Sequence, residues 1–166
     1  MRKRIVIILA ATLTAGVGAG TSYAYLTGQD EVENVFQASG TEITVEEEFT
    51  PIEELTPGCV IKKAPRIVSQ SSTLCYVRMR VNFSDQDAQK KCLPLEINPG
   101  WIEKEDGFYY WQEPLKPGES TGTLFDKVTI RSDVKKEELE AFDLDVYAEA
   151  VQCGGLDAEP AWSTMF

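Results

Sequence analysis

The chain has 166 residues with 16 basic and 27 acidic side chains, four cysteines and no histidine, and its formal net charge is −11. The acidic balance disfavours binding to nucleic acid and to anionic lipid. The absence of histidine removes the most common general base and the most common metal ligand. We therefore expect no nucleic-acid partner, no cofactor and no enzymatic activity.

The first 24 residues have the three parts of a secretory signal peptide, here a cleavable signal helix. Basic residues at positions 2–4 precede an uncharged block over residues 5–20, and the small residues Ser22 and Ala24 follow. We predict that a signal peptidase cuts after Ala24, so that the mature chain begins at Tyr25. An uncleaved anchor is the alternative, but the block is short for the ~20 apolar residues that cross a bilayer. The prediction is a released, extracellular protein without a stable membrane anchor.

The remaining residues divide into a leader and one domain. Residues 25–40 are polar with scattered apolar side chains and no regular period, so we expect a mobile leader there. Residues 41–166 are long enough for a single domain with its own core. Without residues 1–24 the chain carries 13 basic and 27 acidic side chains, a formal charge of −14.

Alternation of apolar and polar residues predicts β-strands throughout this domain. The expected strands cover residues 41–49, 59–67, 75–83, 123–131 and 142–151, with a hairpin over 101–111. Pro65 suggests an edge or a bulge in its strand. The one helix-like stretch is 133–140, and a short helical turn fits within 84–91. Seven to nine strands without crossover helices predict an all-β fold, an antiparallel β-sandwich of the jelly-roll or immunoglobulin-like type.

The strand over residues 75–83 has the clearest pattern in the chain. Val77 and Val81 share the core-facing parity, whereas Arg78 and Arg80 lie on the opposite face. We expect these arginines to be exposed or to pair with acidic residues of a neighbouring strand.

Four cysteines in an exported chain allow two disulfides with three connectivities. No spacing matches a CxxC zinc or redox motif. Buried free thiols are the alternative to disulfides, because one of the four falls in phase with core residues. The candidates are Cys59, Cys75, Cys92 and Cys153.

Motifs that could carry chemistry have simpler structural explanations. Residues 118–122 match GxSxG, but a strand follows and no histidine exists to activate Ser120. Residues 84–87 resemble the start of a calcium loop but lack its glycine and distal glutamate. The aromatic residues of the predicted hairpin are either a contact surface for a sugar or protein, or core packing. They are Trp101, Phe108, Tyr109, Tyr110 and Trp111.

Several segments together resemble the TasA/camelysin family of exported proteins of Gram-positive bacteria. The similarity lies in residues 20–27 (GTSYAYLT), 36–43 (FQASGTEI), 55–58 (LTPG), 62–63, 69–73 and 76–81 (YVRMRV), and it returns at 148–152 (AEAVQ). The resemblance implies a leader cut by a dedicated signal peptidase, a jelly-roll-like β-sandwich, and a role as a subunit of biofilm-matrix fibres. Some members of the family are labelled metalloproteases.

Two functions therefore compete, with an exported hydrolase as a third to be tested. The first is a secreted structural protein that joins other copies, or a matrix partner protein, through β-strand contacts. In that case the freed leader is a donor strand whose apolar residues are Leu26, Val32, Val35 and Phe36. A leader that frays or folds back on its own domain is the alternative. The second function is a monomeric adhesin or ligand-binding module that uses the aromatic hairpin.

Overall fold

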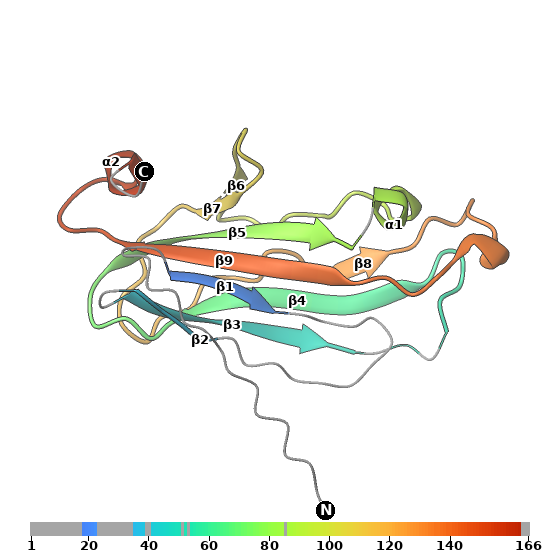
Figure 1. The fold of residues 1–166 in the computed structure, drawn as a ribbon, viewed down its shortest axis with the longest axis horizontal. Coiled ribbons are helices and arrows are strands. Elements are labelled where there is room, and N and C mark those ends of the chain that lie inside the picture. The colour runs from blue at the N-terminus through green and yellow to red at the C-terminus, as the bar shows by residue number, and fades with distance from the viewer. Residues whose placement is uncertain are drawn as a thin grey trace, which may run out of the picture.

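The protein folds into two antiparallel β-sheets that face each other, as the strand pattern predicts (Figure 1). The computed structural model describes residues 18–22, 35–38, 41–50, 52, 54–84 and 86–163, and only the backbone of the first two ranges. The first sheet has the order β1 (Gly18–Ser22), β9 (Leu144–Gln152), β5 (Cys75–Phe83), β7 (Tyr109–Trp111) and β6 (Trp101–Glu103). The second has the order β2 (Val35–Ala38), β3 (Thr41–Phe49), β4 (Val60–Ser69) and β8 (Lys127–Thr129).

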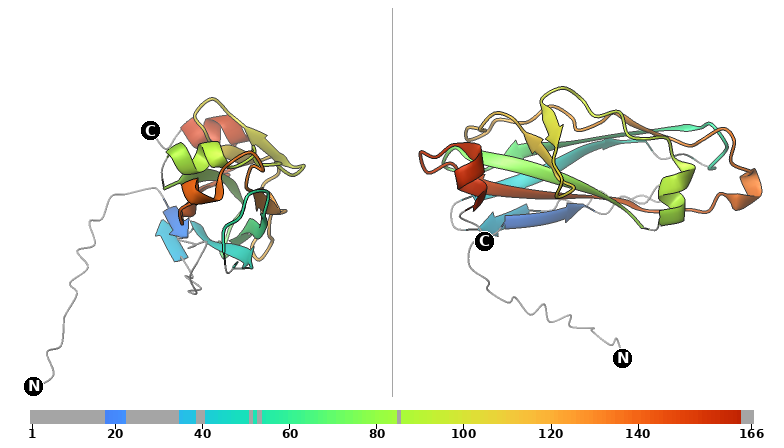
Figure 2. Two further views of the ribbon diagram at one scale, coloured as in Figure 1. Left: turned by 90° about the vertical axis from the view of Figure 1, so that its right-hand side faces the viewer. Right: turned by 90° about the horizontal axis from the view of Figure 1, so that it is seen from above.

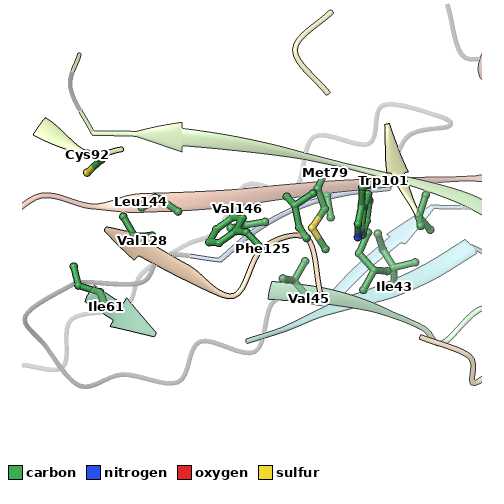
Figure 3. Packing of buried hydrophobic residues seen from close by; sticks show 14 of the residues in the cluster. Ile43, Val45, Ile61, Met79, Cys92, Trp101, Phe125, Val128, Leu144 and Val146 are labelled. Carbon is green, nitrogen blue, oxygen red and sulfur yellow. The ribbon is translucent and has the colours of Figure 1, made fainter. Parts of the chain in front are cut away.

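The core lies between the two sheets and is made by the apolar parity of their strands. Figure 3 shows Ile43 and Val45 from β3 directed towards Met79 and Trp101 of the first sheet. The irregular segment before β8 adds Phe125, which is fully buried. Seen end-on, the strands form two stacked layers with α1 and α2 on one outer side (Figure 2).

Strand β5 confirms the parity predicted for it. It pairs with β9 along all nine residues, from Cys75 opposite Gln152 to Phe83 opposite Leu144. Val77 and Met79 are fully buried in the core, and the neighbouring Arg80 is exposed. Arg78 is buried on the opposite face, for a reason given below.

Pro65 marks neither an edge strand nor a bulge, contrary to expectation. β4 runs unbroken through it, between β3 and β8. The carbonyl oxygen of Pro65 accepts a hydrogen bond from the N–H of Leu124, in the irregular segment that precedes β8. An amide and a carbonyl of one residue point the same way in a strand. The position where proline lacks an N–H therefore faces the segment around Leu124, not β3, and the pairing of β4 with β3 stays intact.

The helical segments and some strand bounds also differ from the expectation. Residues 133–140 contain only the 3-10 turn η1 (Lys136–Glu138), since this charged stretch has no apolar face to bury. The expected turn near residue 86 is α1 (Gln86–Lys91), and a second helix, α2 (Ala158–Ser163), was not predicted. The strand expected over 123–131 is regular only in β8. Gly18–Ser22, assigned to the signal helix, form β1 instead. No helix in the described ranges is long and apolar enough to cross a membrane.

Candidate functional site

The end of the predicted signal peptide lies along the edge of the first sheet. β1 pairs antiparallel with β9, from Gly18 opposite Ala150 to Ser22 opposite Val146. Figure 1 shows β1 in blue beside β9. Ser22 ends this strand, whereas Ala24 and Tyr25, the other residues of the predicted cleavage site, lie outside the described residues. A cut after Ala24 would remove all of β1.

The candidate donor residues divide into two groups. Val35 and Phe36 belong to β2, which pairs with β3 of the same domain opposite Thr44 and Ile43. Leu26 and Val32 fall outside the described residues. The second half of the candidate donor segment is thus an edge strand of its own domain.

The aromatic hairpin packs on the domain instead of displaying its rings. Trp101 is buried, and its indole Nε1 donates a hydrogen bond to the carbonyl oxygen of Gly122. The ring of Trp111 meets Trp101 edge-on, with 5.3 Å between centroids. Phe108 is buried, and Tyr109 and Tyr110 are half-buried. None of the five candidate contact residues is an exposed side chain.

The hairpin and α2 together cover a buried arginine on the outer face of the first sheet. Arg78 is 5% exposed, and its guanidinium donates to Glu149 of the neighbouring β9 with 2.6 Å between Nε and Oε2. The guanidinium carbon lies 4.1 Å from the ring centroid of Phe108 and 4.5 Å from that of Trp162. The charge is therefore neutralised by a carboxylate and lies between two aromatic rings.

Hydroxyl and carboxyl groups extend this network to the surface. Arg78 donates to the hydroxyl of Tyr110, which donates to Asp106 at 2.6 Å. Tyr147 donates to the other oxygen of Glu149 at 2.8 Å. Burial, reinforced by Glu149, raises the pKa of Tyr147 to about 12. Burial also raises the pKa of Tyr110, as does its hydrogen bond to Asp106, so both hydroxyls stay protonated as donors at neutral pH.

The network around Arg78 stabilises its positive charge although the side chain is buried. Burial works against the charge of Arg78, but the hydrogen bonds that it donates to Tyr110 and Glu149 outweigh burial and raise the pKa of the guanidinium. The pairing of Arg78 with an acidic residue of a neighbouring strand is confirmed. Trp162 could not be predicted as a neighbour of Arg78, since α2 is short and has no clear pattern. Glu149 could have been, because it lies on the polar face of β9, directly opposite Arg78 in the antiparallel pairing with β5.

A second buried cation lies between the sheets. Lys63 is fully buried, and its Nζ lies 2.5 Å from Oε1 of Glu47 on β3. Burial lowers the pKa of Lys63, although Glu47 and Asp145 both act to raise it. Oε2 of Glu47 and Oδ1 of Asp145 are buried and accept no hydrogen bond from the residues that the structure describes. Of the three consecutive glutamates Glu46, Glu47 and Glu48 in β3, the middle one therefore points inwards.

The four cysteines are free thiols in this structure. Cys75 belongs to the main core, with its sulfur 3.6 Å from the hydroxyl of Ser69, whereas Cys153 belongs to the apolar cluster under α2. These two thiols therefore lie on opposite faces of the sheet. The backbone of Cys92 pairs with that of Ile130 in an isolated antiparallel β-bridge. The N–H of Ile130 donates a hydrogen bond to the carbonyl oxygen of Cys59. The backbone of Ile130 thus lies between Cys59 and Cys92. Disulfide formation in the exported chain stays a prediction.

The fold and these sites define the class: a two-sheet antiparallel β-sandwich whose buried charges are matched with each other. The chain belongs to a family described as camelysin metallo-endopeptidase, whose model matches residues 1–92, more than half of its length. This match confirms the resemblance drawn from the sequence motifs. No curated protein and no solved structure matches the chain.

The family description corrects one expectation. The prediction that the chain is not an enzyme is wrong, because the family to which it belongs is named for a metallo-endopeptidase. A catalytic zinc in such enzymes takes three protein ligands, most often including histidine. The chain has no histidine, and within the described ranges no three acidic or cysteine side chains converge. Glu47 and Glu149 each bind a cation of the chain itself. The described residues therefore do not fit a catalytic metal ion.

Proposed function

We propose that the chain is a secreted structural protein, a subunit of extracellular matrix or biofilm fibres that joins its neighbours by donor-strand contacts. The observation that supports this function best is the pairing of β1 with β9. The edge partner of β9 lies within the residues that we expect the signal peptidase to remove. Processing would leave the outer backbone groups of Val146–Ala150 without a partner, and such an edge pairs readily with an extended chain.

The same cut would free a segment suited to that role. Residues 25–34 precede β2, and ten residues extend to roughly 33 Å, which is enough for a strand on a neighbouring subunit. Leu26 and Val32 supply apolar side chains within it. A donor that leaves one subunit and enters the next makes a contact that does not close on itself, so repetition generates a filament.

The alternative of a monomeric adhesin has less support. Its proposed contact surface was the aromatic hairpin, whose rings pack against Arg78, Gly122 and each other. An adhesin of this kind would remain a monomer at all concentrations, whereas a fibre subunit would not. Size-exclusion chromatography of the processed chain distinguishes the two.

Metal-dependent proteolysis is a second function, supported by the family description alone. Incubation of the purified protein with an unfolded protein substrate and added zinc tests it. Cleavage that a chelator abolishes would support this function, and it would not by itself argue against fibres.

The test of the fibre function is a pair of charge-matched double variants of the processed chain, viewed by negative-stain electron microscopy. Leu26→Asp with Val32→Asp places two carboxylates on the apolar positions of the donor and should abolish fibres. Thr27→Asp with Asn34→Asp adds the same charge at polar positions and should leave fibres intact. Equal assembly of both variants would refute the donor role, and an absence of fibres from the unmodified processed chain would refute the function.

A further inference from the structure

Strand β1 is an edge strand made almost entirely of small residues. It reads Gly-Ala-Gly-Thr-Ser, and it pairs with β9 over five residues. The core-facing residues of β9 in this stretch are Val146, Ala148 and Ala150, which are fully buried or nearly so. Their partners across the ladder are Ser22, Gly20 and Gly18. Two of these three are glycines, so opposite Ala148 and Ala150 the strand offers backbone pairing alone.

β9 does not need β1 to keep its place in the sheet. On its other side it pairs with β5 along its whole length, from Leu144 to Gln152. Its buried side chains pack into the same core as Phe125 and Leu124. Loss of β1 would therefore leave β9 in position with an open outer edge.

The other described sheet edges are shorter or covered. β6 and β8 have three residues each, and β2 has four. Residues 92 and 93 cover the outer edge of β8. The N–H of Leu93 donates to the carbonyl oxygen of Thr129, and Cys92 pairs with Ile130 in a β-bridge. Short and covered edges are a common protection against unwanted pairing. In the described part of the fold, the edge beneath β1 is the longest one that processing would open.

We infer that β1 is a placeholder: it occupies the outer edge of β9 in the uncut chain and blocks self-association until the signal peptide, residues 1–24, is removed. The inference rests on the proposed fibre function and adds its regulation. The surface is the backbone edge at Val146–Ala150, and its later occupant is the leader of a second copy of the chain. The composition of β1 suits this temporary role, because a strand with two glycines among five residues can be exchanged for one with larger apolar residues.

A reversible covalent lock tests the placeholder in the full-length chain. Thr21 and Tyr147 are directly opposed across the ladder, and opposed residues of antiparallel strands have Cα atoms about 4.5–5.5 Å apart, within disulfide range. The variant Thr21→Cys with Tyr147→Cys also carries a specific protease site after Ala24 and is kept in mild detergent. Each single cysteine variant, with the same protease site, is a control that cannot form the lock.

The inference predicts three results. The uncut chain forms no fibres, the chain cut under reducing conditions does, and the chain cut with the disulfide intact does not until a reductant is added. If the cut, oxidised double variant forms fibres as fast as the single variants do, the placeholder role is overturned and the fibre function still stands. Failure of the cysteine pair to link would also overturn it. If the reduced, cut chain and both controls fail to assemble, the fibre function itself is refuted.

Discussion

Arg78 is a buried charge whose neighbours come from three other segments of the chain. Glu149 lies on the adjacent strand, Phe108 and Tyr110 on the hairpin, and Trp162 on α2. Glu149 and Tyr110 accept hydrogen bonds from the guanidinium, and Phe108 and Trp162 pack against its faces. Together these contacts attach the hairpin and α2 to the sheet. Removing the cation would leave Glu149 as a buried carboxylate without its counter-charge, which is the costly way to break such a pair.

The first prediction compares the two arginines of β5. Arg78→Gln should lower the free energy of unfolding by about 3–5 kcal/mol, because it leaves Glu149 buried and unneutralised. Arg80 has the same parity but is exposed, so Arg80→Gln should change stability by no more than about 0.5 kcal/mol. Urea unfolding of the three proteins measures both values. Similar small losses at the two positions would contradict the burial of Arg78.

The second prediction concerns the thiol of Cys92. Burial, with a smaller contribution from Cys59, raises the pKa of Cys92 from 9.0 to about 11. Between these values the folded chain holds a proton that the unfolded chain releases, so the stabilisation is complete below pH 9 and is lost as the pH rises through 11. Between pH 8 and 11 the unfolding free energy of the parent should therefore fall further than that of Cys92→Val, by on the order of 2–3 kcal/mol.

Urea titrations under reducing conditions at both pH values give this difference. Because the other titratable groups are common to both proteins, their effects cancel in the comparison. A gap between parent and variant that stays constant with pH would show that Cys92 does not titrate as a buried thiol.

At the scale of elements, the ring of Trp111 in the hairpin packs against Gly100. A Cβ on Gly100 would lie 2.4 Å from the Trp111 ring, and this glycine has a φ of +96°. Gly118 also has a positive φ, +77°, but nothing lies within 4 Å of its Cβ position. The two glycines therefore share a backbone requirement and differ in the space around them.

The third prediction follows from that difference. Gly118→Ala should cost only the backbone strain of a left-handed residue, about 1–2 kcal/mol. Gly100→Ala should cost about 1–3 kcal/mol more, because the methyl group displaces Trp111. Thermal unfolding, followed by tryptophan fluorescence, measures both changes. Equal losses would mean that the hairpin does not pack on Gly100 as described.

The sequence predicted those elements whose side chains alternate strictly. β3, β5 and β9 have one apolar face each, so period two identifies them and their core residues. α2 was missed because its six residues are held by Trp162 against Arg78 and Tyr110, a contact that no local pattern reveals. β1 was missed because its residues have low strand propensity and depend on pairing with β9. The inward Lys63 broke the rule that lysine is exposed, and only the pairing of β3 with β4 explains it.

At the scale of the whole molecule, the β-sandwich has a stable core and one sheet edge, that of β9, whose pairing would change when the signal peptide is removed. β3, β4, β5 and β9 enclose the core, and the buried cations Lys63 and Arg78 are each paired with a carboxylate. The edge of β9 depends on residues within the predicted signal peptide. We therefore expect removal of residues 1–24 to alter association far more than the stability of the domain.

Hydrogen exchange of the processed chain, before and after assembly, measures this most directly. The outward-facing amides of Val146–Ala150 should exchange rapidly in the monomer, where β1 is gone, and become protected in the fibre by the leader of the next subunit. Amides of β5, which pairs with β9 along all nine of its residues, serve as the internal reference and should be protected in both states. Fibres in which the β9 edge exchanges as rapidly as in the monomer would contradict the account.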